Sequence, residues 1–339
     1  MKKILFFATI AWLIPGSLLA QFATSTEGFN NNGTRVGQFL KFAVGARANA
    51  MGESFAAVAS DASALYWNPG GIGNLQNLEV HLTHIDYLLD ITFDFAGLVV
   101  PTSAGNIGFS AAVLGMDDEP VTTLADPDGE IGVTWGASSF AVGLTLSKAV
   151  TDRFSVGITG KYIQENIYNE SANTLAIDIG SLYDTGLRGI KIGMAMSNFG
   201  GKMKLDGRDL TLRADPDVVL GGNSNQPADL QVNSWSLPLN FRVGLSLEVF
   251  KNESSTLLLA SDFNHPTDAD ERLNFGAEYG FAKRIFLRGG YKVNYDEESF
   301  TFGGGLNLPI TSYNFMLDYS FNEFGILGET HRFSIGLRL

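Results

Sequence analysis

The chain has 339 residues with 36 acidic and 23 basic side chains, giving a formal net charge of −13. This acidity argues against nucleic acid as a partner. Cysteine is absent, which excludes a disulfide framework, a cysteine-based zinc site and a lipoprotein anchor. Glycine and phenylalanine are abundant, with 39 and 25 residues, and charged residues make up only 17%. This composition suits a protein wall with small residues inside and aromatic residues outside.

The first twenty residues have the pattern of a secretory signal peptide. Lys2 and Lys3 form a basic start, residues 4–14 are apolar, and residues 16–20 are small up to a cleavage point near Ala20. Cleavage there removes two lysines and no acids, so the net charge falls from −13 to −15. No later stretch reaches eighteen apolar residues. We therefore expect membrane insertion to use a closed barrel, which satisfies its backbone without a spanning helix.

Residues 21–36 are polar, and the stretch from Gly37 to Leu75 that follows is rich in Gly, Ala and Ser. It contains two short helix-like pieces. The first covers residues 45–51. The second begins at Ser60-Asp61, a suitable N-cap, and ends before Asn68-Pro69, because the residue before proline avoids helical geometry. Small residues at this density predict a segment packed in a confined space. We interpret it as a plug, so that residues 21–75 form one N-terminal unit.

This stretch resembles the N-terminal signature of the PorV/PorQ family of outer-membrane proteins, which is related in architecture to the FadL-type channels with a hatch inside a fourteen-stranded barrel. One departure is Asn68-Pro69-Gly70-Gly71, where Asn-Pro-Ala-Gly is expected. The matching residues are Phe39-Leu40-Lys41, Val44 to Arg47, Met51-Gly52, Ala56 to Ala59, Asp61, Ser63-Ala64 and Tyr66-Trp67-Asn68-Pro69. The resemblance implies that Arg47, Asp61, Tyr66, Trp67, Asn68 and Pro69 are the plug motif.

From about residue 78 onward, apolar and polar residues alternate with a period of two, in segments of about ten residues that are typical of transmembrane barrels. Phe315, Leu317 and Tyr319, for example, alternate with Met316 and Asp318. We predict an all-β fold, with a 14-stranded antiparallel transmembrane β-barrel over residues 76–339. The predicted strands are 77–88, 91–101, 105–116, 132–147, 153–165, 173–184, 189–199, 236–250, 254–264, 271–281, 284–295, 299–309, 312–322 and 329–339.

The predicted connections alternate between short and long, except for a tight first hairpin near Asp90. Acidic residues gather at the long connections, above all 117–131, whereas basic residues such as Lys148 and Lys283 mark short turns. Asp152, Glu253 and the lysines of the long connection 200–235 are exceptions. Bacterial barrels have short periplasmic turns and longer outer loops, so the long-loop end should face the cell exterior. Six aromatics near strand ends fit membrane girdles: Tyr87, Trp135, Tyr162, Trp235, Tyr295 and Tyr313.

Several charged side chains fall on the polar faces of predicted strands. A fourteen-stranded wall is wider than an eight-stranded one, so its lumen must hold water, a plug or both. Buried charges need partners, and we expect these to pair with one another and with Arg47 or Asp61 of the plug. An ion-pair network that fixes the plug and a substrate-binding role both remain open. The predicted lumen charges are Arg242, Asp262, Glu278, Arg288, Lys292 and Asp318.

Nothing in the sequence supports catalysis, a cofactor or a metal. The four histidines are His81, His84, His265 and His331, and no Gly-x-Ser-x-Gly elbow accompanies them. Residues 126–130 resemble the start of a calcium loop, but the remaining ligand spacing is missing, which favours a solvated acidic loop over loose cation binding. Gly303-Gly304-Gly305 lies inside an alternating strand, so it predicts close backbone packing. We predict that the protein is not an enzyme.

Three functions fit these patterns, all in the cell outer membrane with its lipid as a partner. The resemblance implies an accessory role in type IX protein secretion, with secretion components or secreted cargo as partners. The alternative is a FadL-like channel for hydrophobic small molecules. A lipid-modifying barrel enzyme is the third, and it lacks a visible catalytic set. An apolar pocket behind the plug or a lateral gap in the wall would favour transport, whereas a sealed barrel with large ordered outer loops would favour protein recognition.

Overall fold

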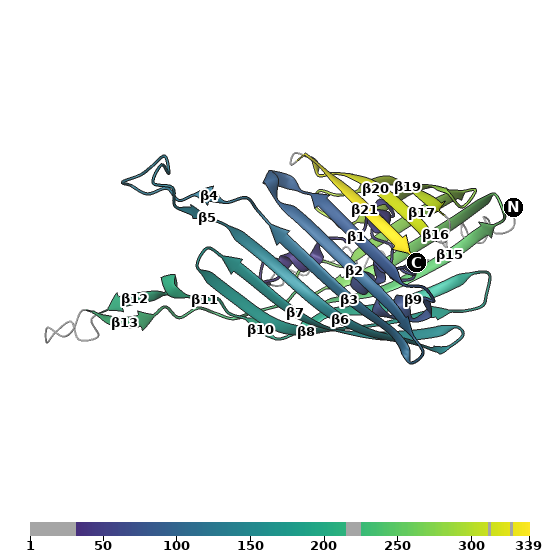
Figure 1. Ribbon diagram of the computed structural model, residues 1–339, viewed down its shortest axis with the longest axis horizontal. Coiled ribbons are helices and arrows are strands. Elements are labelled where there is room, and N and C mark those ends of the chain that lie inside the picture. Colours follow the sequence, from purple (N-terminus) through teal and green to yellow (C-terminus); the bar gives the residue numbers. More distant parts are fainter. Residues whose placement is uncertain (1–31, 215–224, 311–312, 326–327) are drawn as a thin grey trace, which may run out of the picture.

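A computed structural model describes residues 32–214, 225–310, 313–325 and 328–339 (Figure 1). Fourteen long antiparallel strands form one closed barrel, which confirms the predicted fold class. The ring closes between the first and last strands, where Leu82 pairs with Ile335. These strands are β1 Glu79–Asp86, β2 Thr92–Thr102, β3 Gly105–Gly115, β6 Ala137–Thr151, β7 Phe154–Ile167, β8 Glu170–Asp184, β9 Ile190–Gly200, β15 Asn240–Lys251, β16 Ser255–Pro266, β17 Arg272–Phe281, β18 Ile285–Val293, β19 Phe300–Ile310, β20 Tyr313–Glu323 and β21 Glu329–Arg338. The predicted signal peptide and residues 215–224 of the longest connection lie outside the described residues.

Two strands begin later than predicted because the chain before them pairs elsewhere. β6 begins at Ala137 instead of residue 132, since Thr134–Trp135 (β5) pairs with Glu119–Pro120 (β4). β15 begins at Asn240 instead of residue 236, since Trp235–Ser236 (β14) pairs with Lys202–Met203 (β10). β6 also continues to Thr151, through most of a predicted turn. Alternation sets the face of each residue, but it does not show where a strand leaves the barrel.

Hairpins extend the wall at the long-loop end. Figure 1 shows β4–β5 and the pair formed by Thr211–Ala214 (β12) and Gln226–Asp229 (β13) projecting beyond the same end of the barrel. Asp206–Gly207 (β11) adds a short pairing to β8, and a 3-10 turn, η4 Arg208–Leu210, follows it. The tight first hairpin holds another 3-10 turn, η3 Leu88–Asp90. The long-loop end therefore carries ordered β-structure above the barrel mouth.

Apolar side chains cover the outer face of the wall. On neighbouring strands, Leu306, Leu317 and Ile335 pair in register and are 45%, 41% and 47% exposed. Such a band is what a bilayer requires, because lipid contacts replace a protein core. Alternation along residues 237–249 places Leu237 and Val249 on the same face as these outward residues, but both side chains are buried. Val249 lies at a β-bulge between Glu248 and Phe250, and Leu237 lies before β15 begins.

Residues 37–75, here called the inner segment, lie inside the barrel (Figure 1, purple). They form four short helical elements: η1 Gln38–Lys41, α3 Ala46–Ala50, α4 Ala64–Trp67 and η2 Pro69–Asn74. The second helix begins later than predicted, with its N-cap at Ser63, because the Asp61 carboxylate accepts the Ser63 amide hydrogen at 2.9 Å and holds a turn there. No helix within the described residues is long and apolar enough to cross a bilayer.

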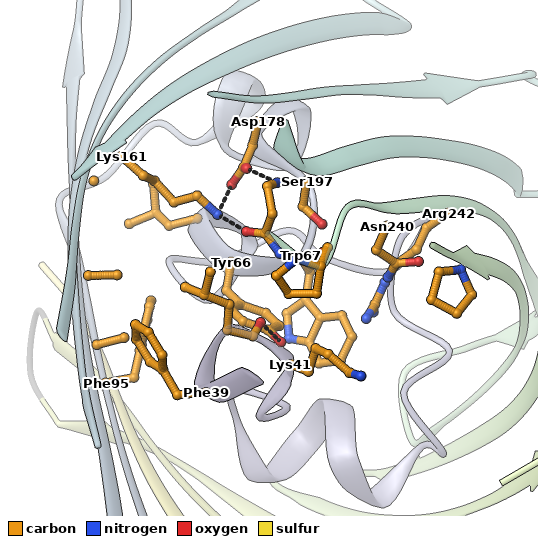
Figure 2. Close-up of a pocket in the computed structure, with 18 of the residues that line it drawn as sticks. Phe39, Lys41, Tyr66, Trp67, Phe95, Lys161, Asp178, Ser197, Asn240 and Arg242 are labelled. Carbon is orange, nitrogen blue, oxygen red and sulfur yellow. Dashed lines mark hydrogen bonds and ion pairs between the residues drawn. The ribbon is translucent and has the colours of Figure 1, made fainter. Parts of the chain in front are cut away.

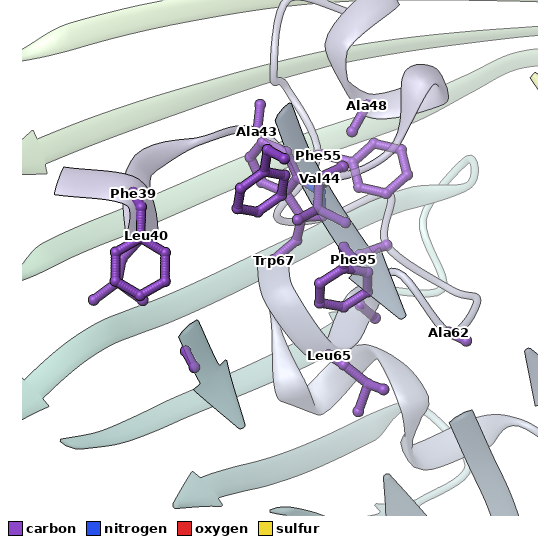
Figure 3. Close-up of a cluster of buried hydrophobic side chains, with 14 of the residues drawn as sticks. Phe39, Leu40, Ala43, Val44, Ala48, Phe55, Ala62, Leu65, Trp67 and Phe95 are labelled. Atoms are coloured by element: carbon purple, nitrogen blue, oxygen red, sulfur yellow. Dashed lines mark hydrogen bonds between the residues drawn. The ribbon is translucent and has the colours of Figure 1, made fainter. Parts of the chain in front are cut away.

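The inner segment brings its own hydrophobic cluster into the lumen. Figure 3 shows Val44, Phe55, Leu65 and Trp67 gathered with Phe95 of β2, and all five are at most 5% exposed. Trp67 packs edge-on against Phe55, with ring centroids 5.9 Å apart. This cluster takes the place that side chains of the wall occupy in a narrower barrel. The fold therefore depends on contacts between the inner segment and wall residues that are distant from it in the chain.

Glycines on the inner face of the wall allow the inner segment to approach closely. A Cβ at Gly290 would lie 2.0 Å from the backbone nitrogen of Gly52, and one at Gly193 would lie 2.1 Å from the carbonyl oxygen of Ala56. In the triplet on β19, a Cβ at Gly303 would lie 2.6 Å from the Ala50 methyl group. The predicted close packing at this triplet is confirmed at Gly303. Backbone-to-backbone contact fixes the depth of the inner segment in the lumen.

Candidate functional site

The Tyr-Trp-Asn-Pro part of the motif ties the inner segment to itself and to the wall. Asn68 donates from Nδ2 to the carbonyl oxygens of Ala56 (2.8 Å) and Ser181 in β8 (2.9 Å), and its Oδ1 accepts from Gly70. Trp67 donates from Nε1 to the Val44 carbonyl at 2.8 Å. Pro69 is the first residue of η2, a position where the backbone N–H that proline lacks would have no partner within the helix. Asn68 therefore meets both its donor and acceptor needs in a buried position.

The departure from Asn-Pro-Ala-Gly has a steric reason in this chain. A Cβ at Gly70 would lie 2.7 Å from the Cα of Ser181, and one at Gly71 would lie 2.3 Å from the carbonyl oxygen of Ala59. Distances below about 3.0 Å require the backbone to move. Both positions therefore need glycine for close approach.

Charged residues of the inner segment pair with charged residues of the wall. Arg47 of α3 contacts Glu278 of β17 at 2.8 Å and Asp61 at 3.4 Å. Glu278 also pairs with Arg288 of β18 at 2.7 Å, and Arg288 reaches Asp318 of β20 at 2.6 Å. Burial raises the pKa of Asp61, but Arg47, His81 and the Ser63 hydrogen bonds outweigh it, so the pKa is lower than usual. The chain of ion pairs runs from the inner segment across three strands of the wall.

A second ionic contact lies nearer the long-loop end. Lys292 of β18 bonds Glu53 of the inner segment at 2.6 Å and also contacts Glu298. Burial alone would raise the pKa of Glu53, but Lys292 and then Arg242 oppose it and bring that pKa to about 2. Asp262 of β16, by contrast, forms no ion pair with any residue that the structure describes. Its Oδ2 accepts the amide hydrogens of Phe55 (2.9 Å) and Ala56 (2.8 Å).

A cavity of about 80 Å³ lies between the inner segment and the long-loop half of the wall. Phe39, Leu65, Phe93, Phe95, Ala112 and Ala141 give it an apolar side. Lys161, Asp178, Asn198, Asn240 and Arg242 give it a polar side, and the motif residues Tyr66 and Trp67 lie between the two (Figure 2). The cavity can therefore offer a ligand both an apolar surface and charged groups.

One polar cluster on the cavity wall is internally satisfied. Lys161 of β7 pairs with Asp178 of β8 at 2.8 Å (Figure 2), and Asp178 accepts the amide hydrogen of Asn198 in β9 at 2.7 Å. Asp178 lies where the pairing of β8 with β9 shifts register. The carboxylate therefore replaces a ladder hydrogen bond at this bulge, and it has a structural task.

Two arginines line the same cavity and lie over aromatic rings, and neither forms an ion pair with a carboxylate among the described residues. The Arg242 guanidinium lies 4.4 Å from the ring centre of Trp67, and that of Arg272 lies 4.2 Å from the ring centre of Tyr295. Tyr295 is thus a lumen residue, and its predicted place in a membrane girdle is wrong. Tyr87 likewise packs inward against Phe42, with ring centroids 4.7 Å apart.

A second cavity, of about 180 Å³, lies on the short-turn side of the inner segment. Arg47, Val58, Lys191, Glu248 and Glu278 are among its lining residues. Arg47 and Glu278 line this cavity, Trp67 lines the first, and the Phe55 ring contacts both Trp67 and Arg47. The inner segment therefore contributes to two lumenal spaces, one on its long-loop side and one on its short-turn side.

All six predicted lumen charges point inward, and five of them bond the inner segment or one another. Arg242 is the exception, since its contact is the ring of Trp67. The sequence reasoning missed Arg272, Lys161 and Asp178. The signal for Arg272 was present, because it precedes Asn274 by two residues and so extends the predicted polar face of β17.

The other candidate sites have structural tasks. Asp126 accepts the amide hydrogens of Glu130 (3.0 Å) and Ile131 (2.9 Å), which closes the β4–β5 loop. In the described parts of the chain, no three His, Asp or Glu side chains are placed to hold a metal ion. His81 contacts Thr83 at 2.9 Å, and His84 contacts Asp94 at 2.8 Å. His265 and His331 each contact a glutamate, Glu271 and Glu329, at 3.1 and 3.5 Å.

No protein-family model matches the sequence, and no curated protein matches it. Solved structures with the same architecture do exist. The Pseudomonas putida toluene transporter TodX has a TM-score of 0.53 at 12% identity, covering 87% of this chain and 96% of that one. The Ralstonia pickettii toluene transporter TbuX has a TM-score of 0.50 at 14% identity, covering 87% and 97%. The CymD monoaromatic hydrocarbon channel has a TM-score of 0.51 at 12% identity, covering 87% and 96%.

Proposed function

We propose that this chain is an outer-membrane channel that admits small hydrophobic molecules past its inner segment, and that it acts by binding and passage without chemistry on the ligand. The observation that carries the proposal is the cavity lined by Phe39, Phe93 and Phe95 at the long-loop end. An apolar space with a few polar groups is the usual form of a small-molecule site. The likeness in fold to hydrocarbon transporters supports the same reading over a secretion role.

The proposed path begins at the long-loop mouth. A ligand would enter the first cavity, where burial of its apolar surface contributes roughly 25 cal/mol per Å². Passage to the second cavity requires the inner segment to shift, because Phe55 contacts both Trp67, which lines the first space, and Arg47, which lines the second. The ion pairs from Arg47 and Glu53 to the wall resist that shift. Ligand binding would have to favour the shifted state for transport to occur.

Filling the cavity tests this function. Ala141→Phe places a large side chain in the cavity, where Ala141 is only 6% exposed. Ala96→Phe is the matched control, because Ala96 lies on the exposed face of β2. We expect the first variant alone to abolish toluene binding by the purified barrel and toluene uptake by cells that express it. Equal binding and uptake by both variants and the parent would contradict the proposal.

A second candidate function is the secretion role implied by the PorV/PorQ resemblance. The observation that favours it is the pair of hairpins that project beyond the barrel mouth (Figure 1). We propose that in this role they would present a surface to a secreted protein or a secretion component. Deleting residues 206–231 removes no barrel strand, so the barrel should still assemble. Loss of partner proteins from a pull-down of the intact barrel would support this role, and an unchanged partner set would count against it.

A further inference from the structure

The cavity in the lumen is lined by a row of three polar side chains, each with one buried hydrogen-bonding atom that has no partner among the described residues. Arg242 of β15 pairs in register with Asn264 of β16, and Asn264 pairs with Arg272 of β17. All three line the cavity. Neighbouring strands are spaced about 4.8 Å apart, so the two arginine Cα atoms are separated by roughly 10 Å. Their side chains are long enough to reach a common point.

Each arginine has one N–H group without a hydrogen-bond partner among the residues that the structure describes. Buried side-chain atoms with no hydrogen-bond partner include Nη1 of Arg242, Nε of Arg272 and Oδ1 of Asn264. Asn240 and Asp268, which line the same cavity, each add an unpartnered oxygen. Native proteins leave few such atoms, and a cluster of them points to water or a ligand. Arginine remains charged at any pH at which proteins fold.

The acids of this cavity do not supply the missing partners. Glu53 pairs with Lys292, Asp178 with Lys161, and Asp268 with Lys41 at 3.0 Å. No ion pair joins Arg242 or Arg272 to any carboxylate in the described part of the chain. Arg242 lies over the ring of Trp67 and Arg272 lies over the ring of Tyr295, and both side chains are only partly buried and line the cavity. A guanidinium group can bind a carboxylate with two parallel hydrogen bonds.

The size of the cavity limits what could occupy it. One water needs about 10–15 Å³ of this volume, so 80 Å³ corresponds to about six water-sized units. A long hydrocarbon chain does not fit such a space, whereas one aromatic ring with one small substituent does. Phe39, Phe93 and Phe95 lie on the apolar side and offer ring edges and faces for contact.

We propose that the cavity binds a small aromatic carboxylate, with its charged group on Arg242 and Arg272 and its ring against the phenylalanine side. This inference rests on the proposed channel function and narrows its substrate class from hydrocarbons to monoanionic aromatic acids. Asn264, between the two arginines, directs its Nδ2 to Asn274 at 3.2 Å, so its free oxygen accepts from water beside the ligand. The contacts with the rings of Trp67 and Tyr295 hold both guanidinium groups in place before the ligand arrives, which lowers the ordering cost of binding.

Calorimetry on the purified full-length barrel in detergent tests the inference, with benzoate, toluene and inorganic phosphate as the probes. We expect benzoate to bind at least tenfold more tightly than toluene, and phosphate not to compete with it. Arg242→Gln and Arg272→Gln should each weaken benzoate binding at least tenfold and change toluene binding less than twofold. Arg242→Lys should weaken benzoate binding less than Arg242→Gln does, because lysine keeps the positive charge and loses only the paired N–H donors of the guanidinium group. Arg284→Gln, at an exposed short turn, is the matched control.

The outcomes separate this inference from the function on which it rests. Toluene binding without preferential benzoate binding overturns the inference and leaves the channel function standing. Benzoate binding that survives both glutamine variants places the anion elsewhere and also overturns it. Phosphate binding as tight as benzoate shows a simple anion site and refutes the role of the aromatic ring. If the folded parent binds neither benzoate nor toluene, both proposals fail. Retained heat-resistant mobility of each variant on a denaturing gel shows that the barrel is folded.

Discussion

Nε of Arg47 in α3 lies 2.8 Å from Oε2 of Glu278 in β17, a residue 231 positions later in the chain. The pair sits where the inner segment meets the wall, and its two side chains are 23% and 8% exposed. Glu278 is shared with Arg288, and Arg47 is shared with Asp61. Each carboxylate or guanidinium group in this network therefore relies on the others to compensate its charge in a buried place.

Removing Glu278 should destabilise the folded barrel more than removing any exposed ion pair. Glu278→Ala leaves Arg47 and Arg288 without a partner in a buried place, and breaking such a pair costs about 3–5 kcal/mol. The free energy of unfolding in urea, measured in lipid vesicles, checks this. Lys251→Ala breaks an exposed contact with Glu248 and should cost less than about 1 kcal/mol. Similar losses in both variants would show that the inner network does not hold the fold.

Arginine at Leu317 should impair folding of the barrel in vesicles far more than arginine at the neighbouring Met316. Leu317 is 41% exposed on the outer face, where arginine near mid-membrane costs about 2–4 kcal/mol. Met316 points into the lumen, where a Cβ at Gly336 would lie 3.0 Å from its terminal methyl. We expect Leu317→Arg to lower the folded fraction in vesicles strongly and Met316→Arg to lower it less. Equal losses of folded fraction in the two variants would show that the assigned register of β20 is wrong.

A methyl group at Gly290 should displace the inner segment. Its Cβ would lie 2.0 Å from the backbone nitrogen of Gly52, and neither backbone can yield without shifting the strand or the segment. Overpacking of this kind typically costs about 1–3 kcal/mol. Gly160→Ala is the control, because nothing lies within 4 Å of the added Cβ. Faster proteolysis of residues 37–75 in Gly290→Ala alone would agree with this, and identical cleavage of both variants would not.

Acid should loosen the inner segment through Glu53. Its folded-state pKa is about 2, below the unfolded value near 4.5, so the unfolded state binds the proton more readily. Its contribution is therefore fully present above about pH 4.5 and is lost as pH falls toward 2. We expect the urea midpoint of the parent barrel to fall over this range, and that of Glu53→Gln to fall less steeply. Parallel pH profiles would mean that other carboxylates account for the loss.

The sequence alone predicted the barrel because alternation is a local property. Every second residue of an extended strand faces the same side, so Phe315, Leu317 and Tyr319 show their common face without any knowledge of neighbouring strands. The same rule gave the inward positions of Asp262, Glu278 and Lys292. The small residues of 37–75 predicted a confined setting, and the structure encloses them within the wall. Which inward charges meet which partners could not be predicted, because pairing depends on strand register and on the depth of the inner segment.

Tertiary structure alone decided the character of the cavity. In the sequence pattern, Arg242 cannot be distinguished from other polar strand residues, and Tyr295 cannot be distinguished from other aromatic ones. Only the closed barrel places Arg242 over the ring of Trp67 and Arg272 over the ring of Tyr295. The exits of β6 and β15 from the barrel likewise depend on hairpin partners 14 residues or more away in the chain. Periodicity in sequence fixes the side on which a residue lies. Contacts between distant residues, which carry the free energy of burial and pairing, fix what that residue touches.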